Sequence, residues 1–264
     1  MTLSITVENA KGEVKASVEA ADRAVLVWDG EYEEGDRIRF GVPTSGDMWR
    51  VRVDDAVDEA SVLLKGTGLT YEVPFGDARI PYSPKAFAGD RHMLSIRALA
   101  DEERFAYGNL AVNPIDQHDC ETCYPHARAN AETRGEAVFF ARNAIDGVTA
   151  NDSHGVWPYA TWGNDGRDDA EIVVEFGRPV DLDEVVLVTR ADFPHDNWWV
   201  SARLTFSNGD VRDLSMERSD QPHRFPVDER GVTWVKLGDL VKSDDPSPWA
   251  ALVQLEAYGR DSEI

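Results

Sequence analysis

Short runs of alternating apolar and polar residues, separated by turn residues, make up most of this 264-residue chain. Through about Ala98 the turns contain Asn-Ala-Lys-Gly, Asp-Gly, Thr-Ser-Gly-Asp and Phe-Gly-Asp, a spacing typical of an antiparallel sandwich. No long helical period appears, so the sequence predicts an all-β fold. The strands that we expect here are Leu3–Val7, Glu13–Glu19, Ala24–Trp28, Arg37–Gly41, Met48–Val53, Ser61–Leu64, Thr70–Phe75 and His92–Ala98.

The length and the apolar content are enough for two hydrophobic cores. The chain has 42% apolar residues and eight tryptophans. We expect an antiparallel β-sandwich over residues 1–108 and a second β domain over residues 109–264, joined near a short helix at Asp101–Tyr107. Another short helical turn is expected within Glu132–Ala144. Since no low-complexity linker separates the halves, we expect them to pack against each other.

The charge and the cysteine count limit the compartment and the partners. A formal charge of −22, from 49 acidic and 27 basic side chains, repels nucleic acid and anionic lipid. The N-terminal segment lacks a basic region followed by an apolar run, and no window approaches the ~18 apolar residues of a membrane span. We therefore expect a cytoplasmic protein with neither a nucleic-acid nor a membrane partner. Cys120 and Cys123 are expected to be reduced thiols.

The segment Ala141–Phe176 carries a family signature. It reads Asn-Ala-Ile-Asp-Gly, a polar loop with Trp, and then an alternating strand that ends at Phe176. This pattern resembles the start of a discoidin-type, galactose-binding-like jelly roll. Expected strands at Glu184–Arg190, Trp198–Phe206 and Ala251–Gly259, with a hairpin at Ser207–Asp210, fit the same template. The resemblance covers the C-terminal half and implies a jelly-roll binding module, most often for sugars.

Three loop segments are rich in functional side chains: Asp116–Asn130, Asn151–Arg167 and Arg190–Trp199. Sugar binding needs an aromatic face for the C–H side of the ring and polar groups for its hydroxyls. The alternative is that the tryptophans fill the end of the barrel while the Arg and Asp side chains pair. If Trp198 starts a strand, it lies on the same apolar face as Val200 and Ala202. Of the two adjacent tryptophans, Trp198 is then expected in the core and Trp199 on the other face. The candidate ligand-binding residues are Trp157, Tyr159, Trp162, Arg167, Arg190, Asp192, His195, Asn197 and Trp199.

Two kinds of metal site are considered. Discoidin-like modules often carry a structural calcium at the Asp-Gly turn, which implies Asp146, Asn151 and a residue of the last strand. That last position is Gln254 here, where the family has an acidic ligand. A transition-metal site would draw on the soft or borderline ligands His118, Cys123, His126 and His154. The spacing of the Cys-x-x-Cys cluster argues against four ligands from one short segment.

The sequence therefore favours a carbohydrate- or glycoside-binding protein whose ligand lies on the loops of the C-terminal jelly roll. A separate enzyme, to which the sugar is presented, is a candidate partner. No catalytic residue is assigned in that interpretation. The alternative is a metal-dependent hydrolase or lyase that acts on a sugar through the His, Cys and Asp residues of the same loops. A third class is a protein-interaction scaffold that uses the N-terminal sandwich.

Overall fold

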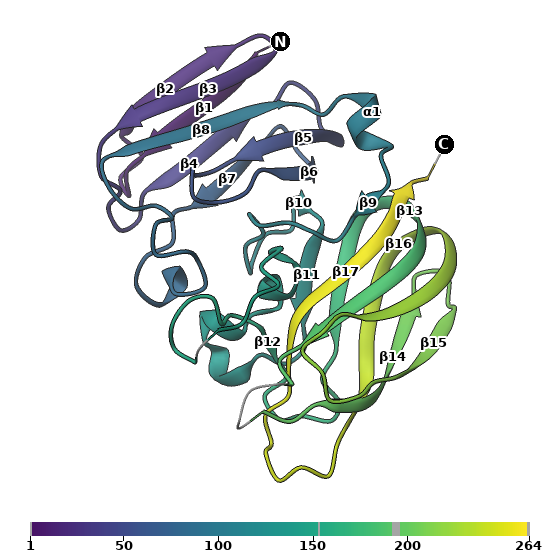
Figure 1. The fold of residues 1–264 in the computed structure, drawn as a ribbon. Coiled ribbons are helices and arrows are strands. Elements are labelled where there is room, and N and C mark those ends of the chain that lie inside the picture. The colour runs from purple at the N-terminus through teal and green to yellow at the C-terminus, as the bar shows by residue number, and fades with distance from the viewer. Residues whose placement is uncertain (1, 153, 192–195, 263–264) are drawn as a thin grey trace.

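The computed structural model describes residues 2–152, 154–191 and 196–262 and is built almost entirely from antiparallel strands (Figure 1). The N-terminal elements are β1 (Leu3–Glu8), β2 (Val14–Ala20), β3 (Arg23–Asp29), β4 (Arg37–Gly41), β5 (Asp47–Arg52), β6 (Ala60–Leu64), β7 (Gly68–Glu72), η1 (Gly76–Arg79), β8 (Arg91–Ala98) and α1 (Asp101–Arg104). The later elements are β9 (Gly108–Asn109), β10 (Cys123–Tyr124), β11 (His126–Ala129), η2 (Thr133–Gly135), η3 (Ala137–Phe139), η4 (Ala141–Ile145), β12 (Trp162–Gly163), β13 (Ile172–Thr189), β14 (Trp199–Phe206), β15 (Val211–Ser215), β16 (His223–Lys242) and β17 (Ala251–Asp261). The predicted all-β class is confirmed.

The N-terminal part is a sandwich of two sheets. One sheet has the order β2-β1-β4-β7 and the other the order β10-β6-β5-β8-β3. Alternate residues of β1 and β3 are buried, as the period of a strand with one solvent face requires. Trp28, Phe40 and Tyr71 are among the side chains that fill the core between the sheets. All eight predicted strands form, most with bounds within one residue, although β7 begins and ends earlier than predicted.

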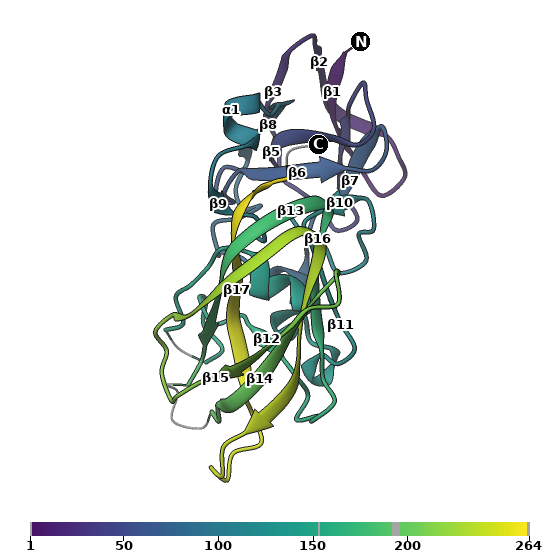
Figure 2. The same cartoon turned by 90° about the vertical axis from the view of Figure 1, so that its right-hand side faces the viewer.

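The C-terminal part is one eight-stranded sheet. Its main order is β12-β17-β13-β16-β14-β15, with β11 paired to β13 and β9 paired to β17. Two long strands, β13 with 18 residues and β16 with 20, carry register shifts where they pair. Irregularities of this kind bend a sheet and increase its twist. Figure 2 shows these strands curving around the core of the C-terminal half, in which Trp162, Phe176 and Trp199 are fully buried.

The predicted side-chain alternation at the start of β14 is wrong. Trp199 is buried with 1% exposure, Trp198 is only partly buried, and Val200 is 38% exposed. The pairing of β14 with β16 shifts register on both sides of Ser201, which inserts an extra residue before the regular alternation resumes at Ala202. Trp199 is therefore the core residue of the pair.

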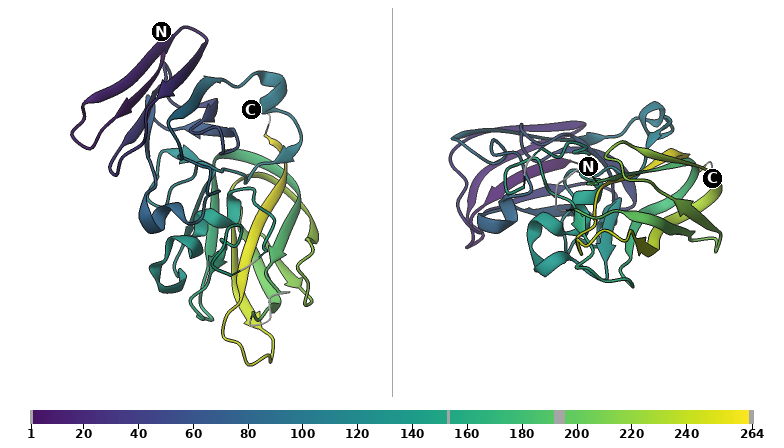
Figure 3. Two further views of the ribbon diagram at one scale, coloured as in Figure 1. Left: turned by 60° about the vertical axis from the view of Figure 1, so that its left-hand side comes forward. Right: turned by 60° about the horizontal axis from the view of Figure 1, so that its bottom comes forward.

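The two halves are connected by more than the chain between them. The short strand β10 adds to the edge of β6, and Ile115 and Cys123 belong to the N-terminal core. At the other end of the junction, the carboxylate of Asp261 accepts from Arg178 at 2.6 Å and from Arg104 at 3.1 Å. Residues after the expected boundary at 108 thus complete the N-terminal sandwich, and Figure 3 shows the halves in contact along this junction. In the described part of the chain, no helix is long and apolar enough to cross a membrane.

Candidate functional site

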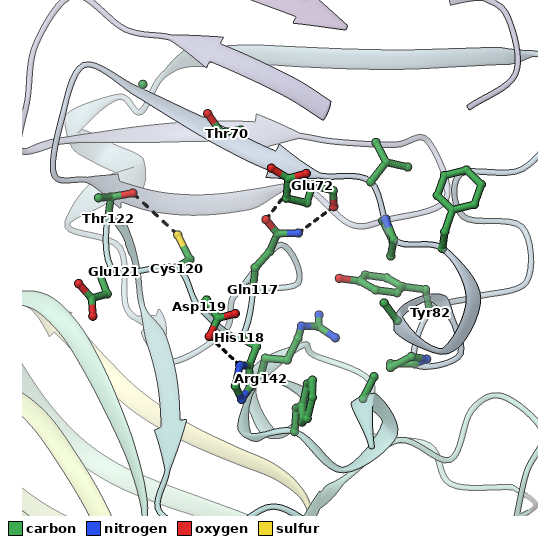
Figure 4. A pocket seen from close by; sticks show the side chains of 18 residues that line it. Thr70, Glu72, Tyr82, Gln117, His118, Asp119, Cys120, Glu121, Thr122 and Arg142 are labelled. Carbon is green, nitrogen blue, oxygen red and sulfur yellow. Dashed lines mark hydrogen bonds and ion pairs between the residues drawn. The ribbon is translucent and has the colours of Figure 1, made fainter. Parts of the chain in front are cut away.

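A pocket with a volume of about 670 Å³ lies where the two halves meet (Figure 4). We call it the large pocket. Strand β7 and the η1 region form one wall, and the loop after Ile115 together with the η3–η4 region forms the other. Its lining combines aromatic and polar side chains from both halves, including Glu72, Phe75, Tyr82, His118, Phe140 and Arg142.

Gln117 fixes the loop of this pocket to the edge of β7. Its side-chain oxygen accepts from the backbone N–H of Glu72 at 3.1 Å, and its amide donates to the carbonyl of Glu72 at 2.8 Å. One carboxamide thus satisfies both backbone groups, as a neighbouring strand would. This contact holds the following residues, His118 to Thr122, along the pocket wall, as Figure 4 shows.

His118 is held between two carboxylates at the pocket wall. Its Nε2 lies 2.7 Å from Glu132 and its Nδ1 lies 3.0 Å from Asp119. Burial opposes the charged imidazolium, but the carboxylates of Glu132 and Asp119 outweigh it and raise the pKa of His118. The ring also lies 4.2 Å from the ring of Phe140, so an aromatic surface and a proton-carrying group adjoin each other.

Arg142 and Tyr82 contact each other in the wall of the large pocket. The guanidinium of the buried Arg142 donates to the carbonyls of Asp116 and Pro114 at 2.6 and 3.1 Å and lies 4.7 Å above the ring of Tyr82. The hydroxyl of Tyr82 lies 3.0 Å from that of Tyr71. These contacts fix both side chains before any ligand binds, a preorganised arrangement that lowers the entropy cost of binding.

Two free thiols lie behind the same wall. Cys120 lines the large pocket, whereas Cys123 is buried in β10. A hydrogen bond from Cys123 lowers the pKa of Cys120 to about 6, and the same interaction together with burial raises the pKa of Cys123. The pair therefore presents one reactive sulfur to the pocket.

A small pocket of about 150 Å³ lies at the loop end of the C-terminal sheet. Trp249, 38% exposed, forms part of it, and the guanidinium of Arg134 lies 6.0 Å from its ring. His154 and Arg190, two residues that the sequence singled out, also line it. This small pocket is formed by C-terminal residues alone.

Several predicted sugar-binding aromatics belong to the core instead. Trp162 and Trp199 are 0% and 1% exposed, with ring centroids 6.1 Å apart, and the indole N–H of Trp162 donates to the carbonyl of Ala131. Tyr159 is 7% exposed and packs against His154. Trp162 and Trp199 thus have no free face for a sugar ring, because the neighbouring strands and loops cover them.

The predicted polar groups are mostly engaged with the protein. Arg190 is buried and forms an ion pair with the buried Asp196. The side chain of Asn197 donates to the carbonyls of Asp245 and Ser247 and so fastens a loop. Arg167 is exposed and pairs with Asp169. The predicted residues Asp192 and His195 lie outside the described residues.

Trp157 lies in another hollow. It is 36% exposed and lines a space of about 430 Å³ together with Tyr82, Arg142 and Asp146, on the side that faces the N-terminal half. The structure therefore does not place Trp157 and Arg190 in one pocket. Their inclusion in a single rim is not supported by the pockets of the described residues.

Two of the three residues expected to hold calcium, Asp146 and Gln254, are hydrogen-bonded to each other. Gln254 is buried and its amide donates to Asp146, while Asn151 has a buried amide without a hydrogen-bond partner among the described residues. The expected transition-metal ligands are dispersed. His126 pairs with the buried Asp116, His118 pairs with Glu132, and His154 lines the small pocket. Within the part of the chain that the structure describes, His118, Cys123, His126 and His154 do not form a ligand cluster.

The sequence did not indicate the N-terminal contribution to the large pocket. Glu72, Phe75 and Tyr82 come from segments that read as a strand end and its following turns. The contact of Gln117 with the edge of β7 brings these residues to face the loop after Ile115. For Trp249 the local sequence does carry a signal. The residue follows the turn-rich stretch Ser243–Pro248, and a large apolar side chain in such a loop is not needed for packing.

No known family model matches the chain, and no characterised protein matches it by sequence. Solved structures with a similar fold include chitosan-binding module 1 of a chitosanase/glucanase from Paenibacillus sp. IK-5, at 20% identity over 58% of this chain and 99% of that one, with a TM-score of 0.40. A fucose-binding module of Streptococcus pneumoniae has 13% identity, covers 58% and 99%, and has a TM-score of 0.40. The family 32 carbohydrate-binding module of C. perfringens NanJ, in complex with galactose, has 16% identity, covers 50% and 91%, and has a TM-score of 0.38. These neighbours are carbohydrate-binding modules, and the sugars are those of the neighbours.

Proposed function

We propose that this chain binds a carbohydrate in the large pocket, on loops of the C-terminal jelly roll that are completed by the η1 region of the N-terminal sandwich. The observation that carries the proposal is the presence of Phe75, Tyr82 and Phe140 in one pocket with hydrogen-bonding side chains. A sugar ring needs both, because its C–H face packs on an aromatic ring while its hydroxyls require donors and acceptors.

The size of the pocket fits this ligand class. About 670 Å³ lies within the range of ~300–1,000 Å³ that is usual for small-molecule sites. Such a space accommodates more than one sugar ring, whereas the small pocket of about 150 Å³ is limited to a single ring or less. The large pocket is therefore the better candidate for an oligosaccharide.

The charge around the pocket favours some sugars over others. Glu72, Asp119 and Glu121 line it, and the side chain of Asp119 is 97% exposed. Arg142 is buried and already donates to backbone carbonyls. Carboxylates at the mouth attract cationic groups and repel anionic ones. We therefore expect neutral or amino sugars to bind more tightly than uronic acids.

Binding is tested with the full chain on a glycan panel that contains neutral, amino and uronic oligosaccharides, followed by calorimetry with the best ligand. Phe140→Ala removes one ring of the large pocket and should weaken binding by about 10- to 100-fold, if stacking on an aromatic ring is worth 1–3 kcal/mol as for a nucleic-acid base. Trp249→Ala is the matched control in a separate hollow, and Trp157→Ala is the control for the neighbouring hollow, which shares Tyr82 and Arg142 with the large pocket.

The controls separate the two parts of the proposal. Loss of affinity in Phe140→Ala alone supports the large pocket. Loss in Trp249→Ala instead would keep carbohydrate binding and move the site to the small pocket. If no member of the glycan panel binds the wild-type chain, the proposed function is wrong.

One observation favours a second candidate, an enzyme that acts on the bound sugar. His118 lies between Glu132 and Asp119 at the wall of the same pocket, an arrangement suited to general acid–base catalysis. Prolonged incubation with the ligand found above, followed by mass analysis of the sugar, tests it. Cleavage that His118→Asn abolishes while binding persists would identify an enzyme.

A further inference from the structure

A buried histidine and two aspartates form a compact cluster in the N-terminal sandwich. Asp54 and Asp55 follow β5, and His92 lies in β8. Their ligand atoms all lie within 4.8 Å of one another. Asp54 and His92 are each 1% exposed, whereas Asp55 is exposed. None of the three lines the large or the small pocket.

The hydrogen bonds of His92 determine where its ring carries a proton. Nε2 lies 3.2 Å from the backbone carbonyl of Gly89, which can only accept, so Nε2 must be the protonated nitrogen. A neutral ring then points the lone pair of Nδ1 at the carboxylate of Asp54. Two electron-rich atoms facing each other in a buried site require a positive charge between them, either a proton or a metal ion. A ring N–H donated to a backbone carbonyl is also the usual outer contact of a metal-binding histidine.

The separation of these two atoms fits two ligands of one metal ion. Nδ1 of His92 and Oδ2 of Asp54 are 3.3 Å apart. A charged N–H···O hydrogen bond is usually ~2.7–2.9 Å long. Two ligands of a tetrahedral ion at ~2.0–2.1 Å from the metal are about 3.3–3.4 Å apart. The observed spacing therefore matches two ligands of one ion.

Tyr32 supplies an independent observation at the same place. Its ring centroid lies 4.4 Å from that of His92, and the residue is 7% exposed. Its buried hydroxyl has no hydrogen-bond partner among the described residues. The contact between the two rings places Tyr32 beside the cluster. A buried hydroxyl beside two carboxylates needs a partner, and the water or inner sphere of a bound ion provides one.

Apart from His92, the carboxylates lack a basic side-chain partner among the described residues. Asp54 is 1% exposed, so burial of its negative charge is costly. No Lys or Arg forms an ion pair with Asp54 or Asp55 in the described part of the chain. A cation bound between them would remove this electrostatic cost.

We propose that Asp54, Asp55 and His92 form a binding site for a divalent transition-metal ion, with Zn²⁺ as the best fit. One imidazole and two carboxylates are a donor set that zinc accepts, whereas calcium takes oxygen ligands and has little use for an imidazole nitrogen. The ion ties the turn after β5 to β8, which pair with each other in the sheet. Its predicted role is to stabilise the N-terminal sandwich, and the exposed Asp55 leaves one side open to solvent.

The test uses the full chain, freed of metal by a chelator and titrated with Zn²⁺ and, for spectroscopy, with Co²⁺. We expect one ion per chain and a higher melting temperature with Zn²⁺ bound. Asp55→Asn removes an exposed ligand that the fold does not need, and it should weaken Zn²⁺ binding at least tenfold. Asp58→Asn is the matched control, because Asp58 is exposed three residues further on and lies outside the cluster.

Cobalt distinguishes this site from the two thiols. Co²⁺ held by oxygen and nitrogen ligands gives visible bands without the strong ultraviolet charge-transfer absorption of a thiolate ligand. Stoichiometric binding that Asp55→Asn weakens and Asp58→Asn retains supports the proposal. The proposal is overturned if the chain binds no stoichiometric Zn²⁺, if Asp55→Asn binds as tightly as the wild type, or if a thiolate band shows that Cys120 and Cys123 hold the ion.

Discussion

The side-chain amide nitrogen of Gln254 lies 2.8 Å from the carboxylate of Asp146, and the same nitrogen donates to the carbonyl of Asn143 at 2.9 Å. The carbonyl of Val148 is 3.3 Å away. A carboxylate and backbone carbonyls that converge on one point are the oxygen ligands that Ca²⁺ prefers. Here an N–H donor group lies at that point, and the side-chain oxygen of Gln254 accepts from the backbone N–H of Gly147. In this chain a glutamine amide thus makes the contacts that calcium would make.

Replacing this amide with a carboxylate should create a calcium requirement. Gln254→Glu places a second buried negative charge against Asp146 and the carbonyl oxygens, and an uncompensated buried charge costs about 3–5 kcal/mol. Millimolar Ca²⁺ should restore most of the loss. Melting temperatures with calcium and with a chelator test this, and the wild type is the control. A variant that is equally unstable in both solutions would show that Ca²⁺ does not make the contacts of the Gln254 amide.

Asp146 should make stability depend on pH. Burial, opposed by Arg142, raises its pKa from 3.8 to about 6. Because the native pKa lies above the unfolded value, the native state favours the protonated form. The contribution to stability is therefore complete below about pH 4 and is lost as the pH rises through about 6, by an amount of about 3 kcal/mol.

Urea unfolding at several pH values between 4 and 7, on the wild type and on Asp146→Asn, isolates this contribution. Asp54 and Asp116 also have raised pKa values and remain in the variant, so only the difference between the two proteins reports on Asp146. That difference should change by about 3 kcal/mol across the range. Parallel pH profiles for the two proteins would refute the assignment.

The sequence predicted most of the N-terminal fold because its strands are short and alternate strictly. It did not predict β16, whose 20 residues include Pro226 and Gly231 and many charged side chains, so that no clear alternation appears. Likewise β13 was divided in two, because Gly177-Arg178-Pro179 reads as a turn although the strand continues through it. Long bent strands are stabilised by the neighbouring strands on both sides. The residues next to them in the sequence therefore do not show where they begin and end.

The candidate site could be predicted only in part from the sequence, for the same reason. The residue types that bind sugars also fill cores, and local sequence cannot distinguish Trp162, covered by the strands and loops around it, from Trp249, exposed at a loop. The large pocket depends on a contact between β7 and the loop at Gln117, 45 residues further on. The loop after Ile115, which the sequence singles out as rich in functional groups, lines this pocket, but its partners across the pocket arise from tertiary structure.

The two adjacent tryptophans at β14 should differ in their effect on stability. Trp199 is fully buried against Trp162, and replacing a buried Trp by Ala usually costs about 3–5 kcal/mol. Trp198 is partly buried and lies under the guanidinium of Arg218 at 5.4 Å, a contact worth about 0.5–1 kcal/mol at an exposed site. Denaturant unfolding of Trp199→Ala and Trp198→Ala measures both. A larger loss of stability for Trp198→Ala than for Trp199→Ala would indicate that Trp198 is the core residue, as the sequence predicted.

The two cysteines should be reduced and should react at very different rates. Cys120 lines the large pocket with a pKa of about 6, so most of it is thiolate at pH 7, whereas the buried Cys123 has a raised pKa. We expect iodoacetamide to modify Cys120 in the native protein and Cys123 only after unfolding. Peptide mapping by mass spectrometry identifies the modified residue.

The pH dependence of this reaction tests the hydrogen bond itself. The wild-type rate should reach half its maximum near pH 6, because the S–H of Cys123 stabilises the Cys120 thiolate. Cys123→Ala removes that donor and should move the midpoint upward, toward the ordinary value of about 8.5. Cys120→Ser serves as the control and should leave the native protein unreactive. A disulfide in the untreated protein, or an unchanged midpoint in Cys123→Ala, would show that the two sulfurs do not interact as described.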